Sequence, residues 1–229
     1  MSDLRLRPLE PRDRADVSKI FWDTMALGQP LPFELAAGSA YEELAQAFFV
    51  GPACAHHGRV LVDGDDRVAG YVLVTDDLDA LESFQRRAAV KYAAGVARAA
   101  ASGRLDRQSA AFHRLRFLDG WYSLREAPSP PQPVVGHFNI ERGRRAFPAG
   151  RLLTDHIDQV AREAGAEGWF GEMNAFTGKR TPALSRVGWS LVHRMPNLTL
   201  SWLRGRPVER FTAVRIPGTH VDRFGQAEG

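Results

Sequence analysis

The residues best suited to chemistry lie in one stretch, 138–153, where an apolar run is followed by several arginines and then by a helical pattern. A turn that opens a helix presents unpaired backbone N–H groups and the positive end of the helix dipole. Arginines around such a turn deepen its positive potential, so that it could hold a pyrophosphate. The same arginines could equally be solvated charges at an ordinary helix start. The stretch therefore predicts an anion site, with a structural role as the alternative.

The elements that must position this turn follow from hydrophobic periodicity. Residues 134–140 form an apolar run that predicts a strand, and residues 169–173 predict the next one. Between them, Leu153, Ile157, Val160, Ala161 and Ala164 share one face of a helix expected from about Gly150 to near Gly165. The sequence thus predicts a strand, a basic turn, a helix and a further strand.

The first third of the chain predicts the order β, α, α, β, β. Alternation over 4–9 indicates a strand, Asp13 is placed as the N-cap of a helix, and Ser39 to Glu42 form a capping box for a second helix. Residues 60–62 and 68–74 read as a hairpin, because Asp63-Gly64-Asp65-Asp66 supplies the turn residues between them.

A helical insertion is expected over about 78–124. Phe84, Ala88, Tyr92 and Val96 recur every four residues, and a second apolar set follows Gly103. The proline-rich residues 128–133 can be neither helix nor central strand and predict a stiff connector. Because so long an apolar addition must pack on something, we expect it to cover the acceptor side of the site or to form a dimer contact.

Three elements are expected after residue 180. Thr181-Pro182 predicts an N-cap followed by Pro at the first position of a short helix. Residues 191–195 and 198–203 are interpreted as the strands that complete the sheet, and residues 218–229 as a flexible tail. The whole of 1–217 is expected to form a single domain.

Composition indicates an ordinary soluble protein. Hydrophobic residues make up 44% and charged residues 25% of the 229 residues, and no apolar run approaches the roughly 18 residues that cross a bilayer. Cys54 is the only cysteine, so no internal disulfide forms, and the first residues lack a signal-peptide layout. We expect a cytoplasmic protein. The formal net charge of +3 alone would suit nucleic acid, a membrane surface or a polyanionic cofactor.

The basic turn resembles the acyl-CoA signature of the GNAT superfamily, in which Arg or Gln precedes a glycine-rich turn and a helix with paired leucines. Arg145, Gly150, Leu152 and Leu153 fall on that pattern, whereas Pro148 stands where the first glycine is expected and removes one N–H donor. Residues 183–189 also resemble the family's short helix that ends in Gly-Phe, with Trp189 in place of Phe. The order of elements follows the family apart from the helical insertion after the third strand.

The resemblance implies an α/β (α+β) fold with a splayed, mixed, mostly antiparallel sheet flanked by helices. Acetyl-CoA or another acyl-CoA, as a co-substrate, would lie between the fourth and fifth strands, and no metal is expected. Backbone groups near the thioester would come from Phe138, Asn139 and Ile140. The phosphates would be held by Arg142, Arg144, Arg145, Ala146, Phe147, Ala149, Gly150 and Arg151.

The implied reaction is direct attack of a neutral amine on the thioester, which needs a base for the amine proton and N–H groups to polarise the carbonyl. Many members use a Tyr in the short helix as the acid, but that position is Leu184 here, and Ser185 would point elsewhere. The candidates are Glu141 and Glu172 as bases and Asn174 as a residue that orients the acceptor. For each of them a surface or capping role is the alternative. His137 is expected to be a hydrogen-bonded core histidine, and Cys54 lacks the partners of a nucleophile.

Three functions follow from these observations. The first is an acyl-CoA-dependent N-acyltransferase that acts on a small-molecule or peptide amine, in a chain that could form a homodimer. The second is a GNAT-like CoA-binding module without turnover, suggested by Pro148 and Leu184. The third is a basic nucleic-acid or membrane-associated protein, suggested by Arg86, Arg87, Lys91 and Arg98 on the polar side of the insertion. If the chain is an N-acyltransferase, we expect neither a nucleic acid nor a membrane as its partner.

Overall fold

The computed structural model describes residues 4–46, 56–126, 130–144, 147–178 and 188–217. Seven strands form one sheet in the order β1-β2-β3-β4-β5-β7-β6. Their bounds are β1 Arg5–Pro8, β2 Arg59–Val62, β3 Val68–Thr75, β4 Val134–Ile140, β5 Trp169–Phe176, β6 Trp189–Pro196 and β7 Val208–Arg215. All neighbouring strands run antiparallel except β4 and β5, which are parallel. The expected mixed, mostly antiparallel sheet is confirmed.

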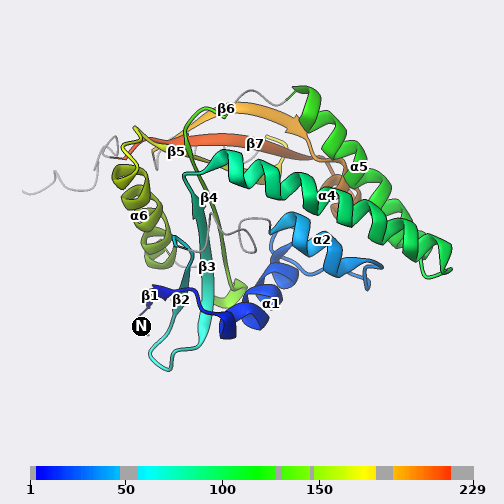
Figure 1. Ribbon diagram of the computed structural model, residues 1–229, viewed down its shortest axis with the longest axis horizontal. Helices are drawn as coiled ribbons and strands as arrows, with labels where there is room; N and C mark the ends of the chain where they lie inside the picture. Colours follow the sequence, from blue (N-terminus) through cyan, green and yellow to red (C-terminus); the bar gives the residue numbers. More distant parts are fainter. Residues whose placement is uncertain (1–3, 47–55, 127–129, 145–146, 179–187, 218–229) are drawn as a thin grey trace, which may run out of the picture.

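Helices cover the two faces of the sheet unequally (Figure 1). The helix α6, Phe147–Glu163, lies on one face, and the other helices lie on the opposite face, which we call the helical face. The helices of the helical face are α1 Arg14–Thr24, α2 Gly38–Ala45, α4 Leu78–Ala101, α5 Arg107–Glu126 and α8 Leu198–Arg204, and short 3-10 turns occupy η1 Pro11–Asp13 and η3 Arg142–Arg144.

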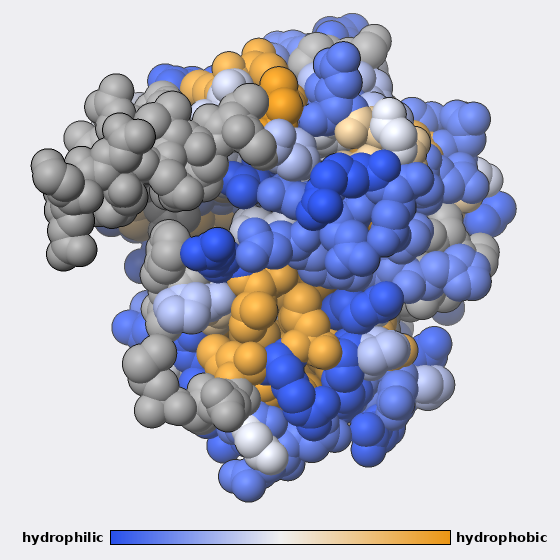
Figure 2. All heavy atoms as spheres, turned by 90° about the vertical axis from the view of Figure 1, so that its left-hand side faces the viewer, coloured by the Kyte–Doolittle hydropathy of each residue, from blue (hydrophilic) through white to orange (hydrophobic). Residues whose placement is uncertain are grey.

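The α6 face is held by an apolar cluster and one buried ion pair. Leu153, Ile157 and Val160 of α6 pack on the sheet, as their spacing predicts. Asp158, in the same helix, accepts hydrogen bonds from Trp169 Nε1 at 2.6 Å and from Arg215 Nε and Nη2, both at 3.0 Å. One carboxylate therefore fixes α6 to both β5 and β7. Figure 2 looks onto the side of the molecule where α6 and β1 lie and shows an apolar patch among hydrophilic residues.

The predicted helical insertion is present as α4 and α5, and it is part of the core. Tyr92 of α4 and Phe112 of α5 are buried in one cluster with Phe21 and Tyr41 from α1 and α2. The ring of Tyr41 lies 5.1 Å from that of Phe112 and 5.8 Å from that of Tyr92. A buried hydrogen bond of 2.6 Å between Tyr92 Oη and His113 Nδ1 joins the two helices of the insertion. Because these rings form one core, removal of the insertion would expose the inner sides of α1 and α2.

The largest error of the sequence analysis concerns residues 198–203, which form the helix α8 and not a strand. Asn197 caps this helix by accepting a hydrogen bond from Leu200 N at 2.9 Å, and Gly205 ends it in the left-handed conformation. The last strand is instead β7, which was not predicted. The alternating apolar pattern of residues 198–203 misled the prediction because the capping residues outweigh it.

Three helix starts differ from the predictions at least in part. Asp13 is at the N-cap position of α1, as predicted, but its side chain makes no cap hydrogen bond to α1 and accepts one from Glu10 N at 2.8 Å. The helix α2 begins at Gly38, so Ser39 lies inside it and its predicted capping box does not form. The helix α6 begins at Phe147 instead of Gly150, which places Pro148 in the first turn, where a missing N–H costs no helical hydrogen bond.

We predict that Gly168→Ala destabilises the protein by roughly 2 kcal/mol, because it overpacks a rigid contact. A Cβ at this position would lie 2.4 Å from the backbone oxygen of Arg215, so a strand would have to move. Urea denaturation followed by far-UV circular dichroism measures the change. The matched control is Gly120→Ala on exposed α5, where a Cβ meets nothing within 4 Å and is expected to add up to about 1 kcal/mol of stability. Equal effects of the two substitutions would contradict the prediction.

Candidate active site

The parallel strands β4 and β5 are paired at only two positions, Val134 with Trp169 and Val135 with Phe170. Beyond them β4 continues to Ile140 beside β3, and β5 continues to Phe176 beside β7. The two halves of the sheet therefore part after Val135 and Phe170, as Figure 1 shows. This point is the splay that the sequence analysis expected.

Side-chain alternation decides which residues face the helical side of the splay. Val135 and Phe170 both pack with Leu78 and Leu81 of α4. Since side chains alternate along a strand, every second residue after them faces the same way. These residues are His137 and Asn139 of β4 and Glu172 and Asn174 of β5.

The structure brings together two of the three predicted catalytic residues. Glu172 and Asn174 lie on one face of β5, within the strand and not at its end, because β5 runs to Phe176. Glu172 and His137 each follow the last paired position by two residues, roughly 7 Å along their strands. Glu141 follows it by six residues, roughly 20 Å along β4. There its Oε1 lies 3.5 Å from Arg67 Nη2, so Glu141 belongs to the far end of the splay.

On the β4 side, three polar side chains form a connected group. Asn139 Nδ2 lies 2.8 Å from Tyr71 Oη and 3.3 Å from His137 Nε2. Burial raises the pKa of Tyr71 above its usual range and lowers the pKa of His137 to about 4. His137 is consequently neutral at physiological pH, in accord with the expected hydrogen-bonded histidine.

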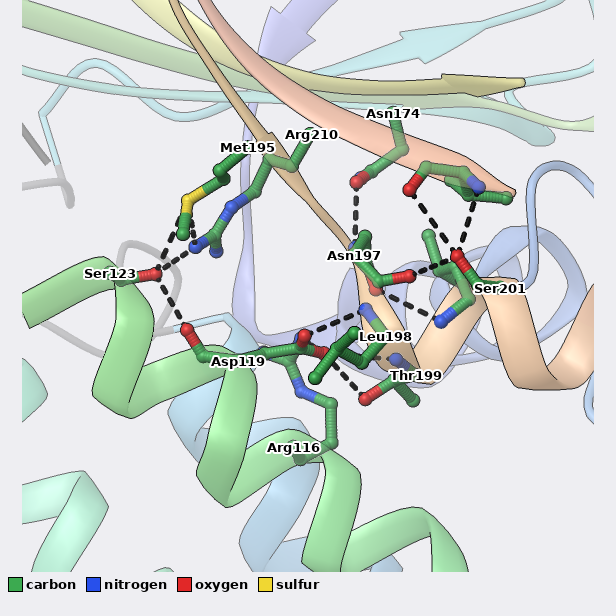
Figure 3. Close-up of polar contacts among 12 residues, drawn as sticks. Arg116, Asp119, Ser123, Asn174, Met195, Asn197, Leu198, Thr199, Ser201 and Arg210 are labelled. Carbon is green, nitrogen blue, oxygen red and sulfur yellow. Dashed lines mark hydrogen bonds and ion pairs between the residues drawn. The ribbon is translucent and has the colours of Figure 1, made fainter. Parts of the chain in front are cut away.

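On the β5 side, Glu172 and Asn174 are held by residues from the C-terminal half of the chain. Glu172 Oε2 lies 3.4 Å from Arg210 Nη1, and Arg210 also donates to Ser123 of α5. Asn174 Oδ1 accepts a hydrogen bond of 2.8 Å from Asn197 Nδ2, the cap of α8 (Figure 3). The amide group of Asn174 keeps its own two N–H donors for other partners.

The basic turn lies at the far end of β4 and leads into α6. Arg142 Nη1 donates to Gln29 Oε1 at 3.3 Å, Arg144 Nη2 donates to Asp63 Oδ2 at 3.0 Å, and Arg151 is an exposed neighbour of Asp155. Among the described residues, no atom lies within 4 Å of a Cβ added to Gly143 or Gly150. An anion can therefore approach the backbone at Gly150 near the start of α6, whereas Ala149 is buried in the apolar cluster and Pro148 has no N–H.

Of the other residues predicted to bind the cofactor, Ile140 is buried and Phe138 is partly buried in the cluster beneath α6. Their side chains are thus core residues, and only their backbone can face a ligand. Arg145 and Ala146 lie outside the described residues, as does the side chain of Phe147. Thr181, Leu184, Ser185 and Cys54 also lie outside them.

Comparison with solved structures shows which fold this is. A protein named SsHAT is 16% identical with a TM-score of 0.58, and the alignment covers 93% of this chain and 98% of that chain. A polyamine N-acetyltransferase from Drosophila melanogaster is 13% identical with a TM-score of 0.50, over 93% and 100% of the two chains. The N-acyl amino acid synthase FeeM from uncultured soil microbes is 15% identical with a TM-score of 0.50, over 94% and 92%.

The chain has the GNAT fold. No protein-family model matches the sequence, and no curated protein matches it either. The likeness is therefore one of fold, and it spans nearly the whole chain. The sheet splays between its fourth and fifth strands, β4 and β5, which is the position that the family resemblance implies.

The sequence analysis missed two arginines of this fold, Arg210 beside the splay and Arg116 on α5. Arg210, the partner of Glu172, lies on β7, and that strand was not predicted. Arg116, on the insertion, has its guanidinium 5.7 Å from the centre of the Tyr41 ring. Here the charged residue Arg116 is partly buried while the apolar residues that follow it, Phe117 and Leu118, are exposed, which is the reverse of the usual helix pattern.

Among the residues described, no helix is long and apolar enough to cross a membrane, and no group of three or more His, Cys, Asp and Glu is arranged to hold a metal ion. A separate pocket of about 870 Å³ lies between α2 and α4. Its lining mixes Lys91, Arg98 and Arg104 with Glu34, Glu43 and Asp106, and it contains no residue of β4 or β5.

We predict that His137 makes the protein less stable in acid. The pKa of His137 is about 4 in the folded protein and 6.5 in the unfolded chain. Between pH 4 and pH 6.5 the unfolded chain therefore binds a proton that the folded protein does not. The free energy of unfolding therefore falls as the pH decreases through this window. We expect His137→Gln to remove roughly 2 kcal/mol of that fall, as measured by urea denaturation at about pH 7 and about pH 4.5.

The control for this measurement is His56→Gln, because His56 is exposed. This variant is expected to keep the acid dependence of the original protein. If His137→Gln kept it as well, His137 would not be the group that titrates.

Proposed function

We propose that the protein is an acyl-CoA-dependent N-acyltransferase that transfers an acyl group, with acetyl as the first choice, to a small-molecule amine. The observation that carries the proposal is the splay between β4 and β5, with an open basic helix start at one end and Glu172 near the other. The names of two structures with this fold, a polyamine N-acetyltransferase and an N-acyl amino acid synthase, support an amine acceptor.

The splay suits the shape of acyl-CoA. On the side of β4 that faces β5, the two strands pair only at Val134 and Val135, so the space where they separate can receive an extended pantetheine arm with its two amides. The pyrophosphate then reaches the start of α6 and the surrounding arginines. The thioester comes to lie near the level of His137 and Glu172, where the two strands separate.

The reaction requires four changes at the thioester. The amine nitrogen attacks the carbonyl carbon and forms the C–N bond, while a base removes one proton from that nitrogen. Backbone N–H groups stabilise the oxyanion, the C–S bond breaks, and the thiolate of CoA leaves and is protonated. The products are an amide and free CoA.

We assign the base to Glu172 and a positioning role to Asn174. Glu172 lies near the narrow end of the splay and faces the helical side, from which an acceptor can approach. Its ion pair with Arg210 orients the carboxylate. Glu141 is held with Arg67 at the far end, close to the expected phosphates, and is less suited to receive a proton from the acceptor.

The alternative of a CoA-binding module without turnover rests on one observation, Pro148 in the first turn of α6, where it removes an N–H from the phosphate site. Binding of acetyl-CoA in a thermal shift assay, with no release of free thiol across a panel of amines, would favour this alternative.

The basic residues of α4 are no evidence of nucleic-acid binding, because two of them are in ion pairs. Lys91 pairs with Glu43, and Arg86 pairs with Glu82.

We predict that Glu172→Gln keeps its affinity for acetyl-CoA and loses roughly 10²- to 10⁴-fold in kcat, because the amine proton loses its acceptor. The loss should shrink at higher pH, where more of the acceptor is already neutral. Release of free thiol measures kcat, and calorimetry measures the binding of acetyl-CoA.

Two matched variants accompany Glu172→Gln. Glu209→Gln removes a carboxylate from the opposite face of the same half of the sheet and should leave kcat unchanged. Glu141→Gln tests the competing assignment. A large loss in Glu141→Gln with a normal rate in Glu172→Gln would transfer the role of base to Glu141.

We predict that the double charge reversal Arg142→Glu with Arg151→Glu raises the Kd of acetyl-CoA by roughly tenfold or more, because both residues flank the expected phosphate site. The effect should weaken as the salt concentration rises. The control, Arg86→Glu, reverses one exposed charge on α4, away from α6, and should leave the Kd unchanged. An unchanged Kd in the double variant would remove the phosphates from this turn.

A further inference from the structure

Arg116 of α5 is a partly buried arginine at the helical face, with 23% of its side chain exposed. Its guanidinium lies 5.7 Å from the centre of the Tyr41 ring, and its Nη1 lies 3.6 Å from Asp119 Oδ2. Figure 3 shows Arg116 beside Asp119, where α5 approaches α8. The distance to Asp119 is that of an ion pair and exceeds that of a hydrogen bond.

Asp119 is directed mainly at α8 and lies too far from Arg116 for a hydrogen bond. Oδ1 accepts from Leu198 N at 2.8 Å, and Oδ2 accepts from Thr199 N at 3.1 Å and Thr199 Oγ1 at 2.6 Å. Asp119 thus caps the start of α8 (Figure 3). In the described part of the chain Arg116 has no hydrogen-bond partner, although a guanidinium carries five N–H donors.

The other arginines of low exposure in the described residues are well provided with acceptors. Arg7 is bonded to Asp13 and Asp66. Arg215 is bonded to Asp158. Arg210 is bonded to Ser123 and Glu172. The guanidinium of Arg116 is partly exposed and makes no hydrogen bond within the described residues, so its N–H groups are open to a binding partner from outside the chain.

The surroundings of Arg116 connect it to the splay. Burial lowers the pKa of Arg116, but Tyr41, Asp119, Tyr92 and Glu172 together raise it above its usual range. Arg116 also lies seven residues before Ser123 on α5, so the two share one face of the helix, and Ser123 accepts a hydrogen bond from Arg210, the ion-pair partner of Glu172. An acceptor with its amine at Glu172 can therefore place an anionic group toward Arg116.

We propose that Arg116 binds a carboxylate of the acceptor, so that the acceptors are amino acids and not simple amines or polyamines. The proposal rests on the proposed function and deepens it. A planar guanidinium can donate two parallel hydrogen bonds to a carboxylate. The ammonium group of a lysine cannot form this bidentate pair. Arg116 is then a specificity-determining residue and takes no part in proton transfer.

The first experiment measures binding without turnover. Leucine, its amine analogue isoamylamine and the amine-free acid isocaproate are titrated into the full-length protein by calorimetry. We expect leucine and isocaproate to bind and isoamylamine to bind at least roughly tenfold more weakly. If neither carboxylate binds better than isoamylamine, the inference is wrong.

The second experiment measures transfer from acetyl-CoA to leucine, isoamylamine and phosphoethanolamine. We expect Arg116→Gln to raise the KM for leucine by roughly tenfold or more, with a smaller change in kcat and none in the KM for isoamylamine. Arg116→Lys should recover only part of the affinity. A preference for phosphoethanolamine over leucine would overturn the carboxylate assignment.

Two controls separate the possible failures. Arg125→Gln removes an exposed cation from the same helix, where it stacks on Trp121, and should change no constant. The melting temperature of each variant shows whether Arg116→Gln acts through folding. Carboxylate binding without any acyl transfer would refute the proposed function and retain the site, whereas transfer to all amines alike would refute the site and retain the function.

Discussion

The rest of the structure depends on the short pairing between β4 and β5. A parallel pair of two residues on each strand contributes few hydrogen bonds, so it cannot by itself hold two halves of a sheet together. The packing on each face must do so. The glycines at this point fit the constraint, since a Cβ on Gly136 would lie 2.7 Å from Ile157 and one on Gly171 would lie 3.0 Å from the oxygen of Gly136. Helix and strands can approach here only because these residues lack side chains.

The two faces hold the halves together by different means. On the α6 face, a buried carboxylate, Asp158, joins the helix to β5 and β7, and the apolar cluster below it includes residues from both halves. On the helical face, α4 packs over Val135 and Phe170 at the junction itself. The helix α5 then reaches α8 through Asp119. The insertion thus supports the splay as well as covering it.

Much of this arrangement could be predicted from the sequence, since it depends on local patterns. The hairpin of β2 and β3 follows from its turn residues, and α6 follows from the spacing of Leu153, Ile157 and Val160. The helix α8 was harder to predict: its local cap, Asn197, is visible in the sequence, but the second acceptor at its start, Asp119, lies 80 residues away from Thr199. The surroundings of Arg116 likewise depend on contacts between distant segments. Glu172 and Asn174 could be selected from their strand, but their partners Arg210 and Asn197 could not.

The edge strands of the sheet, β1 and β6, affect how two copies of the chain can pair. An open edge is a template on which a second sheet can add a strand. Here β1 has four residues and ends in Pro8, while β6 is interrupted by an irregular register at Leu191 to His193 and ends in Pro196. Prolines and bulges remove the regular row of donors that such an addition requires. The edges therefore oppose sheet-to-sheet aggregation, which leaves helix surfaces as the places where another protein can dock.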